Sequence, residues 1–449
     1  AGGFRVRGKP GPVSNRWCGR RTHTVLRVMM ISAKAGMKLA MPVFHPESPS
    51  RVLLRSGFEL DSRTILRLRE LQVRAVWISY PALGFLLKHA SPEVIRHRAA
   101  VAGQVHGLLD ELGRGAHATL EYSSYARTVA SLSQSLIDNP DSNVLLDEVA
   151  AGGDEDLEHA CAVCYISVLM GLKMGTYLEH QRARVSAAVA RDVTPLGVAG
   201  MLHDIGMTQL PDEVRTRWRE VRDESDVRWQ KHVEIGFQLL HGRVPPAAAA
   251  AVLHHHQSYD GTGFPYRTRA DGGSEKLRGS QIHIYARILA TADIFDRMSR
   301  YRDAEGKYAP RVRILSLLLR GQKSRKLDPM VMRALLAVCP PYPPGTLVRL
   351  SDETEGVVVG WDPADPCRPR VMIVDPSLTE ESEPGEIIDV SQTPGLCVAQ
   401  AEGQDVGRDN FYPINRSDFC LETASKLLHN AAELERHREH EADRFKRPA

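Results

Sequence analysis

The pattern of apolar and polar positions divides the chain into a long helical middle and two shorter flanks. Between residues 142 and 338 nearly every segment has apolar residues at helical spacing, with proline or glycine turns between the segments. Residues 91–138 have the same periodicity and begin with a capping serine followed by a first-turn proline, Ser91-Pro92. The pattern therefore predicts a mainly α-helical protein.

The flanks contain shorter apolar runs that favour strands. Residues 29–80 alternate such runs with turns around one helix that starts after Asp61, which indicates a small α+β module. After a proline-rich stretch at 340–344, β-type runs such as 356–359 and 371–374 lie between turn residues and predict a strand-rich appendage. From Leu421 onward a charged helix is expected, with its charges on a solvated face.

The 449 residues are too many for one ordinary core, and the 43% hydrophobic and 25% charged content is typical of globular proteins. The basic, glycine-rich start is interpreted as a solvated tail. The alternatives are a tail that binds RNA or an anionic membrane, and a natural start at Met29 or Met30. The expected parts are a disordered basic tail (1–28), a small α+β module (29–80), a helical connector (81–141), a helical phosphohydrolase domain (142–338), a strand-rich appendage (339–400), and a C-terminal helix and tail (401–449).

Charge and apolar run lengths argue against several classes of protein. A net charge of +3 does not favour a nucleic acid polymer as partner. No secretory signal is visible, and no run approaches the roughly 18 apolar residues of a membrane span. The seven cysteines are scattered and odd in number, so no disulfide framework is expected. These features predict a soluble, cytoplasmic protein.

Histidine and aspartate clusters carry the candidate chemistry. Three histidines at 254–256 precede a glycine-proline loop at 260–265, and His203-Asp204 lies upstream. Imidazole binds borderline transition metals, a carboxylate can bridge two of them, and distant helices can converge on one site in a bundle. Asp293 lies in an apolar helix, where a charge needs a partner or a metal. The residues thus predict a binuclear metal site and a phosphohydrolase.

The candidate ligands are His180, His203, Asp204, His232, His255, His256 and Asp293. Any one histidine alone is more simply a surface residue or a satisfied core residue, and we interpret His159, His241, His283 and His429 in that way.

Read in order, these segments resemble an HD-GYP domain, the phosphodiesterase branch of the HD superfamily that acts on cyclic di-GMP. Residues 202–206 followed by 210–213 resemble HDIGK…IPDEI, and residues 255–265 resemble HHExxDGxGYP. Residues 286–296 are similar to the helix ARIL…ADxFDAL, and residues 231–236 to KHxxxG. Residues 180–185 resemble the first-ligand helix more loosely. The resemblance covers residues 170–335.

The resemblance implies an all-helical domain with two iron or manganese ions. His180, His203, Asp204 and Asp293 would hold one ion, and His232, His255 and His256 the other, with Asp204 bridging. The water between the ions would become the attacking hydroxide, with Asp204 and His203 as catalytic residues. The expected reaction opens cyclic di-GMP to pGpG or GMP in bacterial second-messenger signalling.

The same resemblance suggests substrate and partner contacts. The loop Gly263-Phe264-Pro265 would approach the substrate or a GGDEF-type protein. Helical signalling domains often pair, so a homodimer is a further candidate. Phe264 would stack on guanine or, alternatively, anchor the loop on its own domain. Arg287, Arg300 and Arg302 are candidate phosphate contacts, with surface charge as the alternative.

Four positions depart from the family pattern. Met207 replaces a lysine, Gln257 replaces a glutamate, and Phe264 replaces the tyrosine of GYP. Thr176 stands one turn before His180, where some three-metal members have glutamate, so two ions are expected. The complete ligand set favours a working site, because unpaired buried ligands are costly. The alternatives are a noncatalytic cyclic-dinucleotide receptor and an HD-superfamily phosphohydrolase for another nucleotide.

Overall fold

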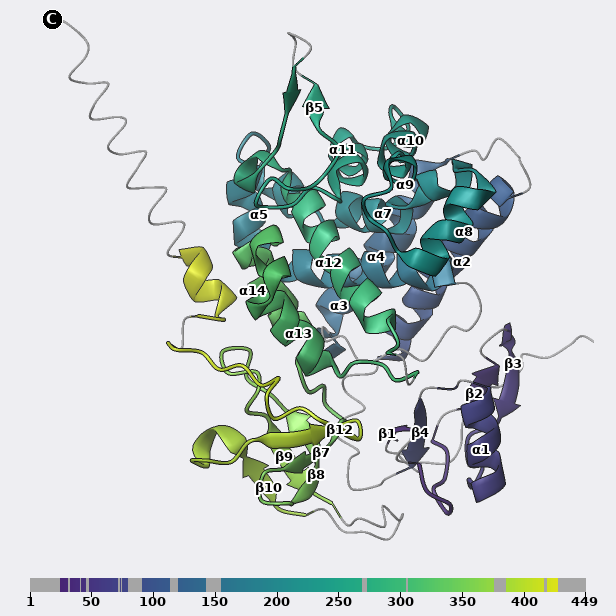
Figure 1. Cartoon of the computed structure of the whole chain (residues 1–449), viewed down its shortest axis with the longest axis vertical. Helices are drawn as coiled ribbons and strands as arrows, with labels where there is room; N and C mark the ends of the chain where they lie inside the picture. Colours follow the sequence, from purple (N-terminus) through teal and green to yellow (C-terminus); the bar gives the residue numbers. More distant parts are fainter. Residues whose placement is uncertain are drawn as a thin grey trace, which may run out of the picture.

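Helices fill the middle of the chain in the computed structural model (Figure 1). The structure describes residues 25–30, 33–40, 42–45, 48–71, 73, 75–79, 91–113, 120–142, 155–268, 273–303, 306–374, 385–415 and 418–426. The helices of this part are α2 (Pro92–Gly113), α3 (Tyr122–Asp138), α4 (Glu155–Lys173), α5 (Gly175–Gln181), α6 (Ala187–Arg191), α7 (Thr194–Leu202), α8 (Asp212–Val221), α9 (Val227–Gln230), α10 (His232–Leu240), α11 (Pro246–His254), α12 (Ile284–Arg300), α13 (Arg311–Arg320) and α14 (Pro329–Val338).

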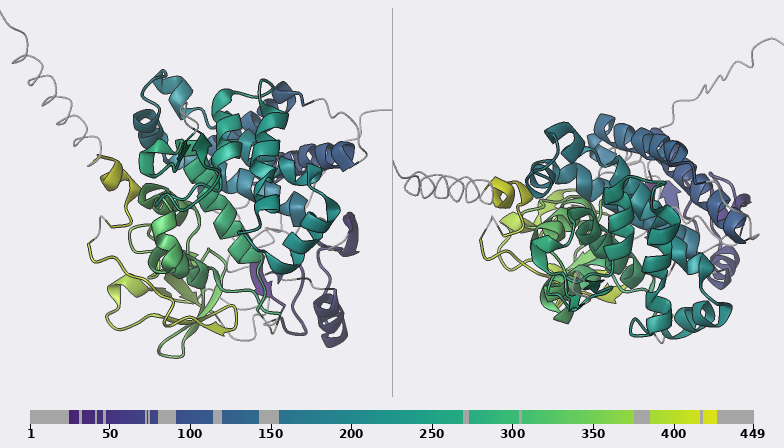
Figure 2. Two further views of the ribbon diagram at one scale, coloured as in Figure 1. Left: turned by 45° about the horizontal axis from the view of Figure 1, so that its top comes forward. Right: turned by 90° about the horizontal axis from the view of Figure 1, so that it is seen from above.

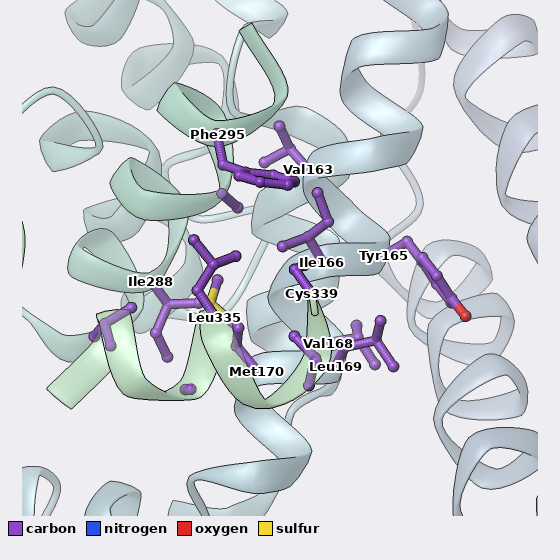
Figure 3. Packing of buried hydrophobic residues seen from close by; sticks show 14 of the residues in the cluster. Val163, Tyr165, Ile166, Val168, Leu169, Met170, Ile288, Phe295, Leu335 and Cys339 are labelled. Atoms are coloured by element: carbon purple, nitrogen blue, oxygen red, sulfur yellow. The ribbon is translucent and has the colours of Figure 1, made fainter. Parts of the chain in front are cut away.

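Helix α4 is the centre of this bundle. It is buried on nearly all sides because its sequence is apolar all round, as is typical of a helix inside a core. It packs against α2, α7, α12 and α14. Figure 3 shows Val163, Ile166 and Met170 of α4 beside Leu335 of α14 and Phe295 of α12. The prediction of a mainly α-helical protein is confirmed.

Helices α2 and α3 belong to the same core. Val101 and Val105 of α2 and Val129 and Leu132 of α3 are buried in one cluster with the residues of α4. These helices therefore pack as part of the bundle and do not form a separate connector. The periodicity shows that they have an apolar face, but only the packing shows what covers that face.

The N-terminal module is built from two short antiparallel pairs and one helix. Strand β1 (Val25–Met29) pairs with β4 (Ala75–Ser79), and β2 (Val43–His45) pairs with β3 (Ser48–Leu54). Helix α1 (Ser62–Glu70) starts at Asp61, whose carboxylate accepts a hydrogen bond from the backbone N–H of Thr64 at 2.6 Å, as the sequence predicts. Residues 25–28, expected in the tail, form most of β1 instead, and residues 1–24 lie outside the described residues.

The C-terminal part forms one antiparallel sheet in the order β10-β9-β8-β7-β11-β12. Its strands are β7 (Leu347–Leu350), β8 (Glu355–Gly360), β9 (Arg370–Ile373), β10 (Ile387–Asp389), β11 (Val398–Ala401) and β12 (Gln404–Asp405). The sheet extends past the expected boundary at residue 400. The expected C-terminal helix is present over residues 421–426, and the rest of it lies outside the described residues.

The N-terminal module and the C-terminal sheet share a hydrophobic core. Val357 of β8 and Met372 of β9 are buried in one cluster with Val28, Leu39 and Ile78 of the module. The two parts lie side by side below the helical bundle in Figure 1, and Figure 2 shows the bundle from two further sides. Within the described residues, no single helix has the length and apolar character needed to cross a bilayer. Helices α4 and α5 meet that test only as a pair bent by 89°.

Candidate metal centre

Histidine and aspartate side chains from several helices meet in two adjoining groups inside the bundle. One group contains Asp204, His232, His255 and His256, and the other contains His159, His203 and Asp293. Within each group the ligand atoms all lie within 4.8 Å of one another. The structure thus brings together six of the seven candidates expected from the sequence, with His159 in addition. His180 lies on α5, outside both groups.

A glycine allows the His203-Asp204 turn to reach helix α10. Helix α7 ends at Leu202, and the short 3₁₀ helix η3 (Ile205–Gln209) follows the pair. A Cβ added at Gly206 would lie 1.9 Å from the carbonyl oxygen of His232 and 2.7 Å from the backbone nitrogen of Gly236. Only glycine permits this approach, which brings Asp204 next to the His232 side chain.

Backbone carbonyls orient three of the imidazoles. The Nδ1 atoms of His203, His232 and His255 lie 2.7–2.8 Å from the carbonyl oxygens of the residues three positions earlier, Gly200, Trp229 and Val252. A ring held in this way donates its Nδ1–H to the carbonyl and keeps a lone pair on Nε2. Each of the three Nε2 atoms therefore has the free lone pair that a metal ligand needs.

Several of these electron-pair donors are buried without a hydrogen-bond partner among the described residues. They are Oδ1 of Asp204 and the Nε2 atoms of His232, His255 and His256. Buried polar atoms normally have partners, since leaving them unpaired is costly. Four inward-facing donors fit a cation that all of them can coordinate. The donor set, imidazole nitrogen and carboxylate oxygen, suits a transition metal ion.

Asp204 lies between the two groups. Its Oδ1 atom is 3.3 Å from Nε2 of His232 and 3.5 Å from Nε2 of His255. Its Oδ2 atom faces the other group, at 3.5 Å from Nε2 of His203 and 3.8 Å from Nε2 of His159. One carboxylate thus presents an oxygen to each group, which is the arrangement that a bridging ligand requires.

His159 occupies the position that the motifs suggest for His180. Its Nε2 atom lies 2.9 Å from Oδ1 of Asp293 and 3.2 Å from Nε2 of His203. Its Nδ1 atom lies 2.6 Å from Oδ2 of Asp296. The interpretation of His159 as an ordinary surface or core histidine does not anticipate its place among the candidate ligands. The available signal was its place near the start of an apolar helix, where a polar ring needs partners.

The expectation of two metal ions rested on Thr176, one turn before His180. With His159 in the site, the residue one turn earlier is Glu155. Glu155 lines the cavity beside the centre, and its carboxylate is 2.7 Å from the guanidinium of Arg222. The position of Thr176 therefore no longer distinguishes two ions from three.

The protonation states of three of the histidines suit metal ligands. Burial lowers the pKa of His203 and of His232 to about 4, and it lowers that of His256 well below its usual value. Burial alone would also lower the pKa of His159, but its hydrogen bonds with Asp293 and Asp296 raise it to about 9. His203, His232 and His256 are therefore neutral at pH 7 with lone pairs available.

Both carboxylates of the centre are ionised. Burial opposes ionisation of Asp204, but His203 and Arg297 hold the pKa of its carboxyl well below the usual value. For Asp293, Arg297 and His159 outweigh burial in the same direction. Arg297 was not expected here, because the family pattern ADxFDAL has alanine at its position.

A cavity of about 770 Å³ opens over the two groups. Asp204, His255, His256 and Asp293 line its floor, and Met207, Trp218 and Phe264 add apolar surface. Its charged lining residues are Glu155, Asp156, Arg219, Glu220, Arg222, Glu224, Arg297, Arg300, Arg302, Lys323 and Lys326. The cavity therefore combines an apolar wall with cationic and acidic groups.

The three candidate phosphate contacts have different locations. Arg300 and Arg302 line the cavity. Arg287 is buried elsewhere, where its guanidinium binds the Asp328 carboxylate at 2.5 Å, the Ile282 carbonyl at 3.0 Å and the Gln181 side chain. Arg287 is thus a structural residue that joins helices, and the expectation of a phosphate contact there is corrected. Its burial could not be inferred from the residue type.

The loop Gly263-Phe264-Pro265 is anchored on its own domain. The Phe264 ring stacks on His256 at 4.9 Å between centroids and meets the edge of Trp229 at 5.7 Å. The amide of Gln257 donates to the carbonyl of Pro265. A Cβ at Gly263 would lie 2.3 Å from the His256 carbonyl oxygen. The glycine therefore allows close packing against this chain's own backbone, and Phe264 takes the anchoring role.

The chain is similar to several known proteins. The HD domain family matches residues 180–331. Over 365 residues the chain is 24% identical to the cyclic di-GMP phosphodiesterase PA4108 of Pseudomonas aeruginosa. This alignment covers 75% of this chain and 82% of PA4108. It is 32% identical over 148 residues to the cyclic di-GMP phosphodiesterase response regulator RpfG of Xanthomonas campestris pv. campestris. It is 30% identical over 141 residues to 3′3′-cGAMP-specific phosphodiesterase 2 of Vibrio cholerae.

The last two similarities cover 32% and 31% of this chain, and only 36% and 25% of those proteins. The HD family match contains six of the grouped donors and begins at His180, after His159. The match therefore includes the residue that the motifs suggest as first ligand, whereas the structure groups His159 with the other donors. The resemblance seen in the motifs is confirmed as far as these matches reach: residues 180–331 match the HD domain family, and the relatives that the chain resembles are named cyclic-dinucleotide phosphodiesterases.

Proposed function

We propose that this protein is a metal-dependent phosphodiesterase that hydrolyses cyclic di-GMP to pGpG or GMP in bacterial second-messenger signalling. The observation that carries this proposal is the convergence of histidine and aspartate donors on the floor of a cavity of about 770 Å³. A cavity of this size suits a ligand as large as a dinucleotide, because ligand pockets generally measure about 300–1,000 Å³.

The residues of the centre divide into two ligand sets. His159, His203 and Asp293 would hold one divalent ion, and His232, His255 and His256 the other, with Asp204 shared. Iron or manganese at these positions would supply charge stabilisation for the phosphoryl group and a water activated at neutral pH. Asp296 holds the His159 ring through Nδ1, so that Nε2 points toward Asp293. The carbonyls behind His203, His232 and His255 do the same for their rings.

The rest of the cavity would bind and orient the dinucleotide. Arg300 and Arg302 line the cavity and would contact phosphate, for which guanidinium is well suited. Trp218 and Phe264 offer ring surface, and Met207 adds a polarisable apolar contact. Because Phe264 is already stacked on His256, it would keep a ligand histidine in place and meet a base only with its remaining exposed surface.

The names of the relatives support this substrate class. PA4108 and RpfG are named cyclic di-GMP phosphodiesterases, and the Vibrio cholerae relative is named specific for 3′3′-cGAMP. Both substrates are cyclic dinucleotides. A substrate panel should therefore contain cyclic di-GMP, 3′3′-cGAMP and a simple phosphodiester without guanine, so that the HD-superfamily alternative is also tested.

The deciding experiment measures cyclic di-GMP turnover by the full chain, purified without oxygen and loaded with iron or manganese, with metal content determined on the same sample. Hydrolysis with at least two ions per chain supports the proposal. A protein that binds metal and hydrolyses only the simple phosphodiester would contradict the substrate assignment. A protein that binds no metal would contradict the mechanism.

A noncatalytic receptor for cyclic dinucleotides is the second candidate, and Met207 favours it. Met207 stands where the family pattern has lysine, and its side chain packs against the cluster of Leu210, Val214, Trp218 and Trp229. Bound dinucleotide and bound metal without turnover would favour the receptor. Binding through the loop at 263–265 to a GGDEF-type protein, and a homodimer, stay predictions.

A further inference from the structure

An arginine side chain lies inside the candidate metal centre. Arg297 is one turn beyond Asp293 on α12, and its Nε atom is 2.5 Å from Oδ1 of Asp293. Its second contact is between Nη2 and Oδ2 of Asp204, at 3.1 Å. One guanidinium therefore binds both carboxylates of the candidate metal centre, Asp204 after α7 and Asp293 on α12.

Aromatic rings hold the other side of this guanidinium. Its Cζ atom lies 5.1 Å from the ring centre of Trp218 and 5.9 Å from that of Trp229. The two indoles are stacked, with centroids 3.9 Å apart and planes within 13°. A cation over indole rings is attracted to them. Arg297 thus occupies a built position, and only 18% of its side chain is exposed.

The oxygens that Arg297 binds are the oxygens that face the ligand histidines. Oδ1 of Asp293 also lies 2.9 Å from Nε2 of His159, and Oδ2 of Asp204 also lies 3.5 Å from Nε2 of His203. An ion held by His159, His203 and these two carboxylates would sit within a few ångströms of a permanent positive charge. Arginine cannot relieve that repulsion by losing its proton.

We propose that Arg297 is a resident counter-ion that competes with a metal ion for Asp204 and Asp293 and so lowers the metal affinity of the centre. This inference rests on the proposed metal-dependent function. In metal-free protein the guanidinium neutralises two buried carboxylates. When a metal binds, Arg297 gives up these contacts, and the cavity that it lines offers room for the displaced side chain.

The test is a Mn²⁺ titration of the metal-stripped full chain, with thermal unfolding measured on the same samples. Arg297→Met removes the competing charge. Arg300→Met is the matched control, because Arg300 makes the corresponding pair with Asp296 at 2.5 Å and also pairs with Glu158 at 2.8 Å, and neither carboxylate belongs to the two ligand groups. We expect Arg297→Met to bind Mn²⁺ about tenfold more tightly than wild type, and Arg300→Met to bind it no more tightly than wild type, since only the first variant removes a charge adjacent to the ion.

Thermal unfolding gives a second readout. Metal-free Arg297→Met should unfold at a lower temperature than metal-free wild type. Mn²⁺ should raise the Tm of the variant by more than it raises the Tm of wild type. An Arg297→Met affinity no higher than that of wild type, in a protein whose wild type binds Mn²⁺, would overturn the competition and leave the metal centre standing. If neither wild type nor variants bind Mn²⁺, the proposed centre and this inference fail together.

Should Arg297→Met not fold, Arg297→Gln carries the test. Glutamine removes the charge and keeps side-chain N–H donors that can bind the two carboxylates. Tighter Mn²⁺ binding than wild type would support competition, and unchanged or weaker binding would contradict it.

Discussion

The imidazole of His159 is held between two carboxylates one turn apart on α12: Nε2 lies 2.9 Å from Asp293, and Nδ1 lies 2.6 Å from Asp296. This relationship ties the start of α4 to the helix that carries Asp293. The two ring nitrogens therefore have different partners: Nε2 faces the other candidate ligands, and Nδ1 faces the Asp296 carboxylate behind them.

His159→Ala should therefore lose most bound metal, while His180→Ala should retain it. The first variant removes a donor of the group formed with His203 and Asp293, and the second removes a ring outside both groups. Metal content after loading and desalting, measured on both variants, checks the expectation. The reverse result, with metal lost only in His180→Ala, would restore the assignment that the motifs suggest.

Gly206→Ala should destabilise the fold and weaken metal binding, because its Cβ would meet the His232 carbonyl oxygen at 1.9 Å. Overpacking of this kind costs about 1–3 kcal/mol, and a backbone contact cannot be relieved by a rotamer change. Gly107→Ala on the exposed face of α2 is the matched control, with nothing within 4 Å of its added Cβ. It should stabilise by up to about 1 kcal/mol. Urea unfolding of both variants measures the difference, and equal stabilities would show that the turn can move.

Gln257→Glu, which restores the family residue, should loosen the loop at 263–265. The buried amide of Gln257 donates to the Pro265 carbonyl, whereas an ionised carboxylate can only accept. The lost donor should cost about 1–3 kcal/mol at pH 7. Hydrogen exchange of the loop and Tm measure the effect, which should shrink as acid protonates the new carboxyl. The exposed Gln392→Glu is the control and should change little.

His283 should make the protein less stable as the pH falls. Burial, with Arg182 and Arg287 nearby, lowers its pKa from 6.5 to about 4, and its Nδ1 atom accepts from the Tyr285 N–H at the start of α12. Between these values the unfolded chain binds the proton more readily than the folded protein, so stability present above about pH 6.5 is progressively lost. At pH 5 the loss from this residue is about 2 kcal/mol.

His283→Asn keeps a capping acceptor and removes the titration. Denaturant unfolding at pH 7 and pH 5 should show a smaller pH dependence for the variant than for wild type. Parallel curves would mean that His283 has nearly the same pKa in the folded protein as in the unfolded chain, which would contradict the expectation. Other buried histidines contribute equally to both proteins and cancel in the difference.

The sequence predicts the helical body and most of the metal site because both depend on local patterns. Helical periodicity, the Asp61 cap and the spacing of His203-Asp204 and His255-His256 all lie within short segments. His159 was missed because α4 is apolar all round, and such a helix does not show which of its residues face another helix. Its partners, Asp293 and Asp296, are distant in the chain.

Three arginines of α12 show the same limit of prediction from sequence. Arg287, Arg297 and Arg300 share one helix and one side-chain chemistry, yet they bind Asp328, the two carboxylates of the centre, and Asp296 respectively. Residue type predicts that each of them can bind an anion. Burial and the position of α12 against its neighbours decide which anion, and neither can be obtained from the sequence pattern alone.

The core that residues 28–78 share with Val357 and Met372 bears on how the chain is made. A ribosome releases the N-terminal strands first, but part of their covering surface emerges only after the whole helical body has been synthesised. Contacts between such distant segments close slowly, because the loop between them is long. The N-terminal module, although it is synthesised before the helical body, should therefore be among the last parts to reach its final packing, and a chain interrupted before β8 would leave it incompletely covered.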